Sequence, residues 1–368
     1  MAQNDNSSPD RRAILAGAAA WMAAGGARAN LPRLPLWALA QQKGILFGAS
    51  ATWDVIRDAD YGALHARESR LVVTDTALKY DFLRPQEHVL DFSEADALLD
   101  FARNNGMQYR GLPLFWNYLP PNWMKSKSKA QVERLFDEHI EVTVSRYAGH
   151  LQSWDVVNEP FWPDHGAPGG FRRGVWFDAL GESYIERAWR RVAALDSTAK
   201  LVLNEAFTEH DDVLGRQVRA LMLPLIDRML DKGLKLDAIG LQAHLRPQVA
   251  FDLDKFLRFI DEIRARKLRI YLTEFDVDDD GLPEDTTRRD EITAQWTTRF
   301  LTPVLANPAV EMLVTWQLSD KYTWFRAPEV MNARKSKFAP RPLPFDHDLR
   351  PKPMLHAIAN ALANAPAR

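Results

Sequence analysis

The chain of 368 residues contains no cysteine. Disulfide bonds, thiolate nucleophiles and cysteine-ligated metal sites are therefore excluded together. The chain also has no excess of positive charge, because 47 Lys and Arg face 49 Asp and Glu, for a formal net charge of -2 at pH 7. Domains that bind nucleic acid through bulk charge are usually strongly basic, so we expect no nucleic-acid partner. No apolar run after residue 29 is long enough to cross a membrane, so we expect no membrane contact.

The first 29 residues have the pattern of a targeting segment. Arg11 and Arg12 precede an Ala-rich apolar run without a charge until Arg28, and Ala27-Arg28-Ala29 has the form of a cleavage site. The apolar run is too short and too rich in Ala and Gly to span a bilayer as a stable helix. We predict a twin-arginine-type signal peptide at 1–29 and a catalytic domain at 30–368, with export to the periplasm or cell exterior. An amphipathic helix at the start of the chain is the alternative.

Apolar runs of strand length recur along the rest of the chain, separated by segments of helical period. We predict strands at 44–50, 71–76, 108–115, 153–159, 200–205, 238–245, 269–277 and 311–319. Helices are predicted between them, for example from Ser93 to near Gly106 and over 129–147. This alternation without a break in composition predicts the α/β class, as a single (β/α)8 TIM barrel. A doubly wound open sheet is the alternative, although no Gly-rich phosphate turn follows the first predicted strand.

Two glutamates stand where predicted buried strands end. Glu159 closes the fourth predicted strand, and Glu274 lies at the end of the seventh. In such a barrel the catalytic groups come from the carboxyl ends of the strands, so both side chains should face one cleft. Acid residues in that position are suited to proton and nucleophile chemistry, and a pair of them suits the cleavage of a glycosidic bond. A salt bridge at a strand end is the alternative for either glutamate alone.

Other polar groups and many aromatic rings fall at the same level of the predicted barrel. The polar groups are Asn158, Asn204, Gln242, His244 and Lys79. The rings follow the third, fourth and eighth predicted strands, namely Trp116, Tyr118, Trp123, Phe161, Trp162, Trp316, Tyr322 and Trp324. Rings that line a polar cleft suit the apolar faces of sugars. Core packing is the alternative for any single ring, because buried aromatics are common.

Several ordered motifs resemble those of the family 10 glycoside hydrolases, whose best-known members are endo-1,4-β-xylanases. The principal motifs are Trp-Asp-Val-Val-Asn-Glu-Pro at 154–160, Gly-Leu-Gln-Ala-His-Leu at 240–245 and Thr-Glu-Phe-Asp-Val at 273–277. Further matches at 77–81, 92–96, 110–116, 175–185, 199–201 and 316–324 extend the resemblance over nearly all of the chain after residue 29. Many motifs in one order are far more specific than any one of them.

The resemblance implies a retaining glycoside hydrolase that cleaves a β-1,4-linked polysaccharide backbone, xylan or xylan-like, by double displacement. It implies that Glu159 is the general acid/base and that Glu274 is the nucleophile. It also implies that His244 hydrogen-bonds Glu274, that Asp276 orients the His244 imidazole and that Asn158 holds the sugar 2-hydroxyl. We expect substrate contacts from Lys79, Asn117, Trp116, Gln242, Asn204, Trp316 and Trp324. The expected partner is a polysaccharide or oligosaccharide, and the chain is expected to be a monomer without cofactor or metal.

The chain departs from the family pattern at positions expected to contact sugars. The two histidines usual in and just after the third strand are replaced by Leu112 and Asn117, and Thr76 stands where an amide is usual. A buried sugar hydroxyl left unpaired is costly, so we predict that unsubstituted xylan is a poor substrate. Basic clusters at 125–129 and 334–337 suggest an acidic or decorated glycan, although a solvated basic surface is the alternative.

Other functions are compatible with the same residues. A transglycosylase, or an enzyme that trims the producer's own exopolysaccharide, would use the same acid pair, whereas a non-catalytic glycan-binding barrel would have no need of it. Two acidic stretches also need weighing as metal sites. Residues 276–281 match the opening of a calcium loop, but Thr287 stands at the position that requires a bidentate Glu. The stretch 209–212 is better explained as a solvated acidic turn.

Overall fold

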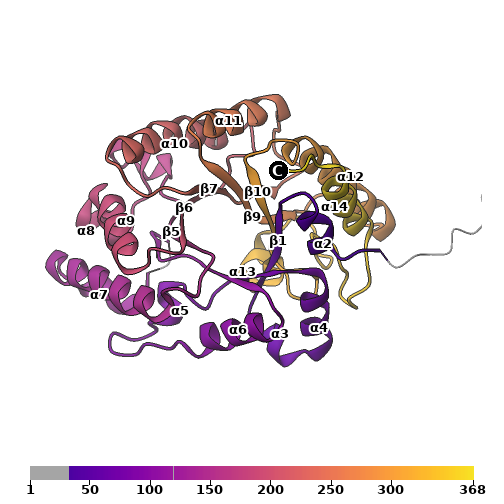
Figure 1. The fold of residues 1–368 in the computed structure, drawn as a ribbon. Helices are drawn as coiled ribbons and strands as arrows, with labels where there is room; N and C mark the ends of the chain where they lie inside the picture. The colour runs from indigo at the N-terminus through magenta and orange to yellow at the C-terminus, as the bar shows by residue number, and fades with distance from the viewer. Residues whose placement is uncertain (1–32, 119) are drawn as a thin grey trace, which may run out of the picture. The chain divides into compact units, whose positions relative to one another are not determined.

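The fold is a closed barrel of parallel strands surrounded by helices (Figure 1). The computed structural model describes residues 33–118 and 120–368, so the predicted signal peptide at 1–29 lies outside the described residues. Residues 35–368 form one compact unit. The strands are β1 (Leu46–Ala51), β2 (Leu71–Thr74), β3 (Gln108–Gly111), β4 (Phe115–Trp116), β5 (Ser153–Asn158), β6 (Lys200–Glu205), β7 (Ala238–Leu241), β8 (His244–Leu245), β9 (Arg269–Val277) and β10 (Val310–Thr315).

Eight of these strands close the barrel. They pair in the order β10-β1-β2-β3-β5-β6-β7-β9, and β9 pairs back to β10. The predicted (β/α)8 barrel is therefore confirmed, and the open-sheet alternative is wrong. Two predicted strands are each divided, into β3 with β4 and into β7 with β8. The first break contains Pro113, which has no N–H for the ladder, and the second contains Ala243, whose φ of 62° leaves the extended conformation.

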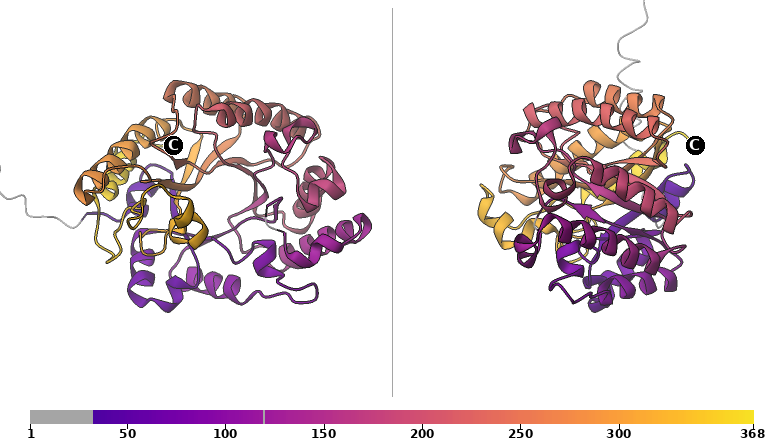
Figure 2. Two further views of the ribbon diagram at one scale, coloured as in Figure 1. Left: turned by 180° about the vertical axis from the view of Figure 1, so that it is seen from behind. Right: turned by 90° about the vertical axis from the view of Figure 1, so that its left-hand side faces the viewer.

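Helices cover the outside of the barrel, as the views in Figure 1 and Figure 2 agree. They are α2 (Leu36–Gln41), α3 (Asp54–Arg57), α4 (Ala59–Glu68), α5 (Tyr80–Leu83), α6 (Ser93–Asn104), α7 (Lys129–Tyr147), α8 (Val175–Leu180), α9 (Ser183–Leu195), α10 (Val213–Asp231), α11 (Leu253–Ala265), α12 (Thr286–Val304), α13 (Pro328–Ala333) and α14 (Pro353–Asn364). Short 3-10 turns are η1 (Asn122–Ser126), η2 (Pro163–His165), η3 (Pro168–Gly170) and η4 (Trp324–Arg326). Within the described part of the chain, every helix is too short or too polar to cross a bilayer.

Apolar stripes explain why these helices pack on the barrel. In α9 the buried residues are Tyr184, Ile185, Ala188, Trp189 and Val192, which share one helical face. Every residue of β5 is buried, as expected for a parallel strand that is covered on both sides.

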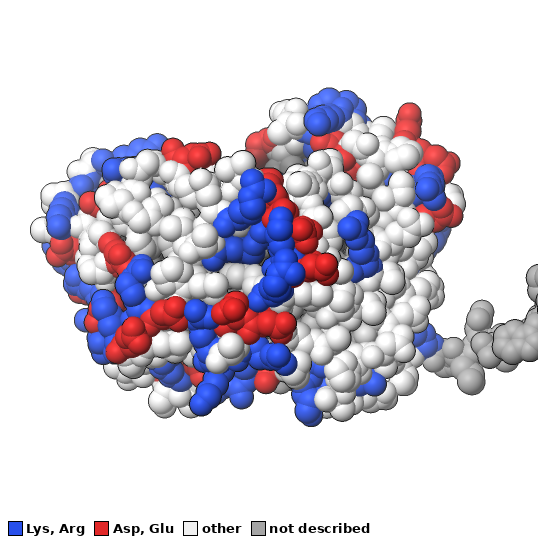
Figure 3. Space-filling view, turned by 90° about the horizontal axis from the view of Figure 1, so that it is seen from above, with Lys and Arg blue, Asp and Glu red and all other residues white. Residues whose placement is uncertain are grey.

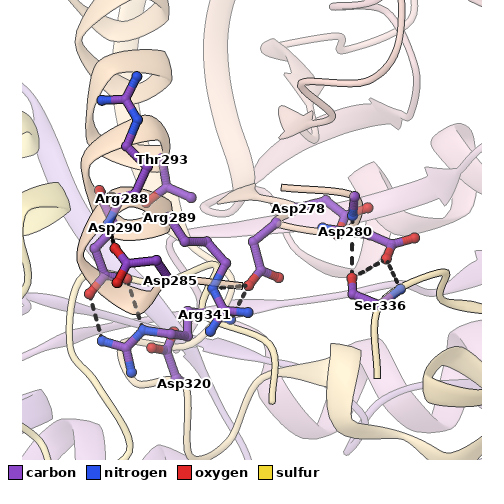
Figure 4. Close-up of polar contacts among 12 residues, drawn as sticks. Asp278, Asp280, Asp285, Arg288, Arg289, Asp290, Thr293, Asp320, Ser336 and Arg341 are labelled. Atoms are coloured by element: carbon purple, nitrogen blue, oxygen red, sulfur yellow. Dashed lines mark hydrogen bonds and ion pairs between the residues drawn. The ribbon is translucent and has the colours of Figure 1, made fainter. Parts of the chain in front are cut away.

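The acidic run after β9 is held by cations and backbone groups. Arg334 donates to Asp278 at 3.0 Å and to Asp279 at 2.6 Å. The backbone N–H of Ser336 donates to Asp280 at 2.8 Å, a contact visible in Figure 4. The segment between β10 and α14 is thus fastened to the loop after β9 by buried ion pairs. These contacts occupy the carboxylates that a calcium loop would need, and the calcium alternative finds no support.

Candidate active site

A cavity of about 320 Å³ opens where the strands end. Its wall includes Lys79 from the loop after β2, Trp116 from β4 and Glu159 from the end of β5. It continues with His244 from β8 and Glu274 from β9. Because parallel strands in a closed barrel present their carboxyl ends on one face, segments far apart in the sequence meet in this cleft.

Glu159 is held from three directions. Its φ of 48° turns the backbone at the end of β5, and its N–H donates to the carbonyl of Asn204 at 2.9 Å. Its carboxylate accepts from the Gln242 amide at 2.9 Å and from the Arg172 guanidinium at 2.7 Å. Arg172 also donates to the Glu159 carbonyl at 3.0 Å. A left-handed φ in a residue with a side chain is unfavourable and clusters at functional sites, which agrees with a position held for chemistry.

Glu274 faces a charged imidazole. The Nε2 of His244 lies 3.3 Å from the Glu274 carboxylate, and the Nδ1 lies 2.9 Å from Asp276. Burial by itself lowers the pKa of His244, but the charges and hydrogen bonds of Asp276 and Glu274 outweigh it and raise that pKa to about 10. His244 is therefore a cation at neutral pH. Its Nε2 donates a charge-assisted hydrogen bond to Glu274, and its Nδ1 side forms an ion pair with Asp276.

Asn158, Asn204 and Gln242 connect the two glutamates through side-chain amides. Asn204 donates to Glu274 at 2.8 Å and to the amide oxygen of Asn158 at 2.9 Å. Gln242 donates to the same oxygen at 3.3 Å and to Glu159 at 2.9 Å. The relative position of the two carboxylates is thus set by one hydrogen-bonded network across β5, β6, β7 and β9.

The structure brings most of the predicted residues to this cleft. Those that line it are Lys79, Trp116, Asn158, Glu159, Gln242, His244, Glu274, Trp316 and Trp324. Asn204 and Asp276 are completely buried behind the wall, where Asn204 holds Glu274 and Asp276 holds His244. Asp276 also accepts from the indole N–H of Trp324 at 2.9 Å.

Asn117 lies elsewhere than predicted. Only 5% of it is exposed, and its amide oxygen accepts from the backbone N–H groups of Trp176 and Phe177, each at 3.1 Å. Trp176 and Phe177 lie in the first turn of α8, where the backbone N–H groups have no acceptor within the helix. The structure therefore gives Asn117 a capping contact rather than a place on the cleft wall, which corrects the expectation of a direct sugar contact.

Two arginines of the cleft were missed by the sequence reasoning. Arg172 pairs with Glu159, and Arg246 follows β8 on the cleft wall. Nothing in the sequence distinguishes Arg172 from its neighbour Arg173, and Arg246 could have been found only from its position two residues after His244. Among the described residues, no group of three or more His, Asp or Glu could hold a metal ion.

The barrel and its cleft define the class of this protein. Two carboxylates face one cavity, each fixed by polar donors, with Trp116, Trp316 and Trp324 on the wall. This is the arrangement of a retaining or inverting glycosidase built on a TIM barrel.

Comparison with known proteins identifies the family. A model described as glycosyl hydrolase family 10 matches residues 36–361, and the chain belongs to this family as a xylanase-like glycosidase. It is 27% identical to endo-1,4-beta-xylanase B of Thermotoga neapolitana over 332 residues, which cover 88% of this chain and 90% of that protein. The structure of xylanase 10B from Thermotoga petrophila RKU-1 in complex with xylobiose is also 27% identical, with a TM-score of 0.80 and coverage of 90% and 98%.

Proposed function

We propose that this protein is an endo-acting β-1,4-xylanase that hydrolyses the backbone with retention of configuration. The observation that carries the proposal is the pair Glu159 and Glu274 on one cavity wall, joined by a single amide network. The relatives with matching sequences are named as xylanases, and one solved relative holds xylobiose. A non-catalytic binder would not need two acids held in this way.

In the proposed mechanism Glu274 is the nucleophile. Its carboxylate attacks the anomeric carbon, the bond from that carbon to the leaving-group oxygen breaks, and a glycosyl-enzyme intermediate forms. A nucleophile must be ionised, and the Glu274 carboxylate lies 3.3 Å from Nε2 of His244 and accepts a hydrogen bond from Asn204 at 2.8 Å.

Glu159 is the general acid and then the base. It donates a proton to the leaving-group oxygen in the first step and takes a proton from water in the second. Arg172 donates to the Glu159 carboxylate at 2.7 Å, so the first step requires this guanidinium to release or reorient when Glu159 donates its proton.

The stereochemistry and the nucleophile can be tested together. The enzyme is incubated with xylohexaose while proton NMR follows the anomers of the new reducing ends. Retention gives the β-anomer first, followed by slow mutarotation. Glu274→Gln should lower turnover by about 10⁴-fold or more, whereas Glu284→Gln, which changes an exposed Glu in the same way, should leave it unchanged. An α-anomer formed first, or a fully active Glu274→Gln variant, would contradict the proposal.

Export is proposed separately from the chemistry. The paired Arg11 and Arg12 before the apolar run support a twin-arginine route to the periplasm or cell exterior. Replacing both arginines by Lys in the full chain should keep the unprocessed protein in the cytoplasm, as fractionation and mass measurement would show. Unchanged export and processing of the Lys variant would contradict this route.

A further inference from the structure

Arg246 differs from the other cations of the cleft because it has no acidic partner. Lys79 lies 3.5 Å from Asp75, and Arg172 lies 2.7 Å from Glu159. Arg246 also lines the cavity, yet no ion pair with it exists among the described residues. A guanidinium that is always charged, partly buried and unpaired is a binding group for an anion.

Two other residues near Arg246 complete its surroundings. The guanidinium of Arg246 lies 5.3 Å from the centre of the Phe207 ring, and Phe207 has a φ of 63°. This unfavourable backbone conformation places an aromatic residue on the cleft wall beside the cation. Glu209 also lines the cavity, but it is 1% exposed and its carboxylate lies 3.7 Å from Nδ1 of His210. Glu209 is therefore buried within the wall, whereas Arg246 is only partly buried.

The position of Arg246 relative to the scissile bond follows from a chain of contacts. The Arg172 guanidinium that holds Glu159 lies 4.6 Å from the Trp162 ring. The Trp162 and Phe207 rings pack edge to face with their centres 5.6 Å apart, and the Arg246 guanidinium lies over the Phe207 ring. A continuous surface thus runs from Glu159 to Arg246. Because Glu159 is proposed to protonate the leaving-group oxygen, this surface lies on the leaving-group side of the bond.

The basic clusters at 125–129 and 334–337 are less suited than Arg246 to bind an acidic glycan. Arg334 is 5% exposed and paired with two aspartates, Lys127 pairs with Glu87 at 2.6 Å, and Lys337 donates to the Arg334 carbonyl at 2.7 Å. Lys and Arg also lie beside Asp and Glu across much of the face in Figure 3. Attraction of an acidic glycan by these surface clusters is therefore not favoured, and the unpaired cation is in the cleft.

We propose that Arg246 and Phe207 form a subsite on the leaving-group side that binds a sugar carrying a carboxylate, such as a uronic acid. The guanidinium presents parallel N–H donors that match a carboxylate, and the Phe207 ring offers an apolar face for the sugar. The inference rests on the proposed xylanase function and names the substituent that this site selects. A charge-assisted pair of this kind should raise kcat/KM about tenfold or more.

The experiment compares substrates that differ only in charge. One is a xylo-oligosaccharide with a single uronic acid branch, and its control is the same compound with the carboxyl group reduced to an alcohol. A linear β-1,4-linked oligouronide distinguishes a carboxylate of the backbone from one of a branch. The variants are Arg246→Gln, Arg246→Lys, which keeps the charge without the paired donors, and Lys125→Gln, which removes an exposed charge outside this cavity.

The readout is the ratio of kcat/KM for the acidic substrate to that for the reduced one. We expect Arg246→Gln to lower this ratio about tenfold or more, Arg246→Lys to give an intermediate ratio and Lys125→Gln to leave it unchanged. Reaction in water labelled with oxygen-18 marks the new reducing end, and the uronic acid should lie on the unlabelled product. A further outcome is that Arg246→Gln leaves kcat/KM for the branched substrate unchanged relative to its reduced control and still lowers kcat/KM for the linear oligouronide. In that case the subsite is supported, with a carboxylate of the backbone as its ligand.

The possible failures are distinguishable. An equal ratio in wild type and Arg246→Gln for both acidic substrates, with good cleavage of the reduced substrate, would overturn the subsite and leave the xylanase function intact. A uronic acid on the labelled product would overturn its placement on the leaving-group side. No cleavage of any xylo-oligosaccharide by the wild type would instead contradict the proposed function.

Discussion

Asp276→Asn tests how the charge of His244 is maintained. Asp276 is completely buried, forms an ion pair with Nδ1 of His244 at 2.9 Å and accepts a hydrogen bond from the Trp324 indole at 2.9 Å. Asparagine has one oxygen for two donors. If that oxygen stays with Trp324, the amide N–H₂ faces Nδ1 of His244, which can then accept only when it carries no proton. We therefore expect the substitution to make His244 neutral near pH 7.

The magnitude follows from the pKa of His244. A rise from 6.5 to about 10, at about 1.4 kcal/mol for each pH unit, corresponds to about 5 kcal/mol of favourable interaction with the charged ring. Asp276 is the larger favourable contributor and Glu274 the smaller. Because the folded pKa is raised, this stabilisation is fully present below about pH 6.5 and is lost as the pH rises through about 10. The variant should lose most of this pH dependence.

Two measurements check the prediction. Nitrogen-15 NMR of the His244 ring, from about pH 5 to about pH 10, should show a charged ring over most of this range in the wild type and a pKa shifted toward 6.5 in the variant. Thermal unfolding over the same range follows the stability. Asp227→Asn is the matched control, since Asp227 is a half-exposed surface carboxylate paired with Arg266. A His244 ring that titrates at the same pH in Asp276→Asn and wild type would refute the reasoning.

Three further changes test separate parts of the structure. Glu159→Gln should slow cleavage of xylo-oligosaccharides by about 10²- to 10⁴-fold, and much less for aryl glycosides whose leaving groups need no proton, as steady-state rates on both substrates will show. Arg110→Met should lower the free energy of unfolding by about 3–5 kcal/mol in urea titrations, because fully buried Asp155 loses its ion-pair partner. Gly240→Ala should lower kcat about tenfold or more with an unchanged circular dichroism spectrum, because its Cβ would lie 2.2 Å from the Asn204 amide oxygen.

The local sequence was sufficient to predict the barrel and its two acids. The limits of β6 and β9 agree with the predicted 200–205 and 269–277, and α7 agrees with the predicted 129–147. These elements depend on local patterns, namely buried apolar runs and a capping box at Ser128. Glu159 could be placed because it directly follows such a run, and Glu274 because it lies in the carboxyl-terminal half of one. Their meeting in one cleft then follows from the closure of any barrel of this kind.

Only the tertiary structure decided how those acids are held. Arg172 reaches Glu159 from the loop after β5, and Asn117 caps α8 instead of facing the cleft. Arg246 has no acidic partner among the described residues, whereas the basic residues suspected from the sequence include Arg334, which is buried in ion pairs. The path of a loop depends on its packing against segments that are distant in the chain, and those segments also supply the ion-pair partners of its charged residues. Sequence spacing predicts neither the loop path nor the ion pairs, because both depend on contacts between residues that are far apart in the sequence.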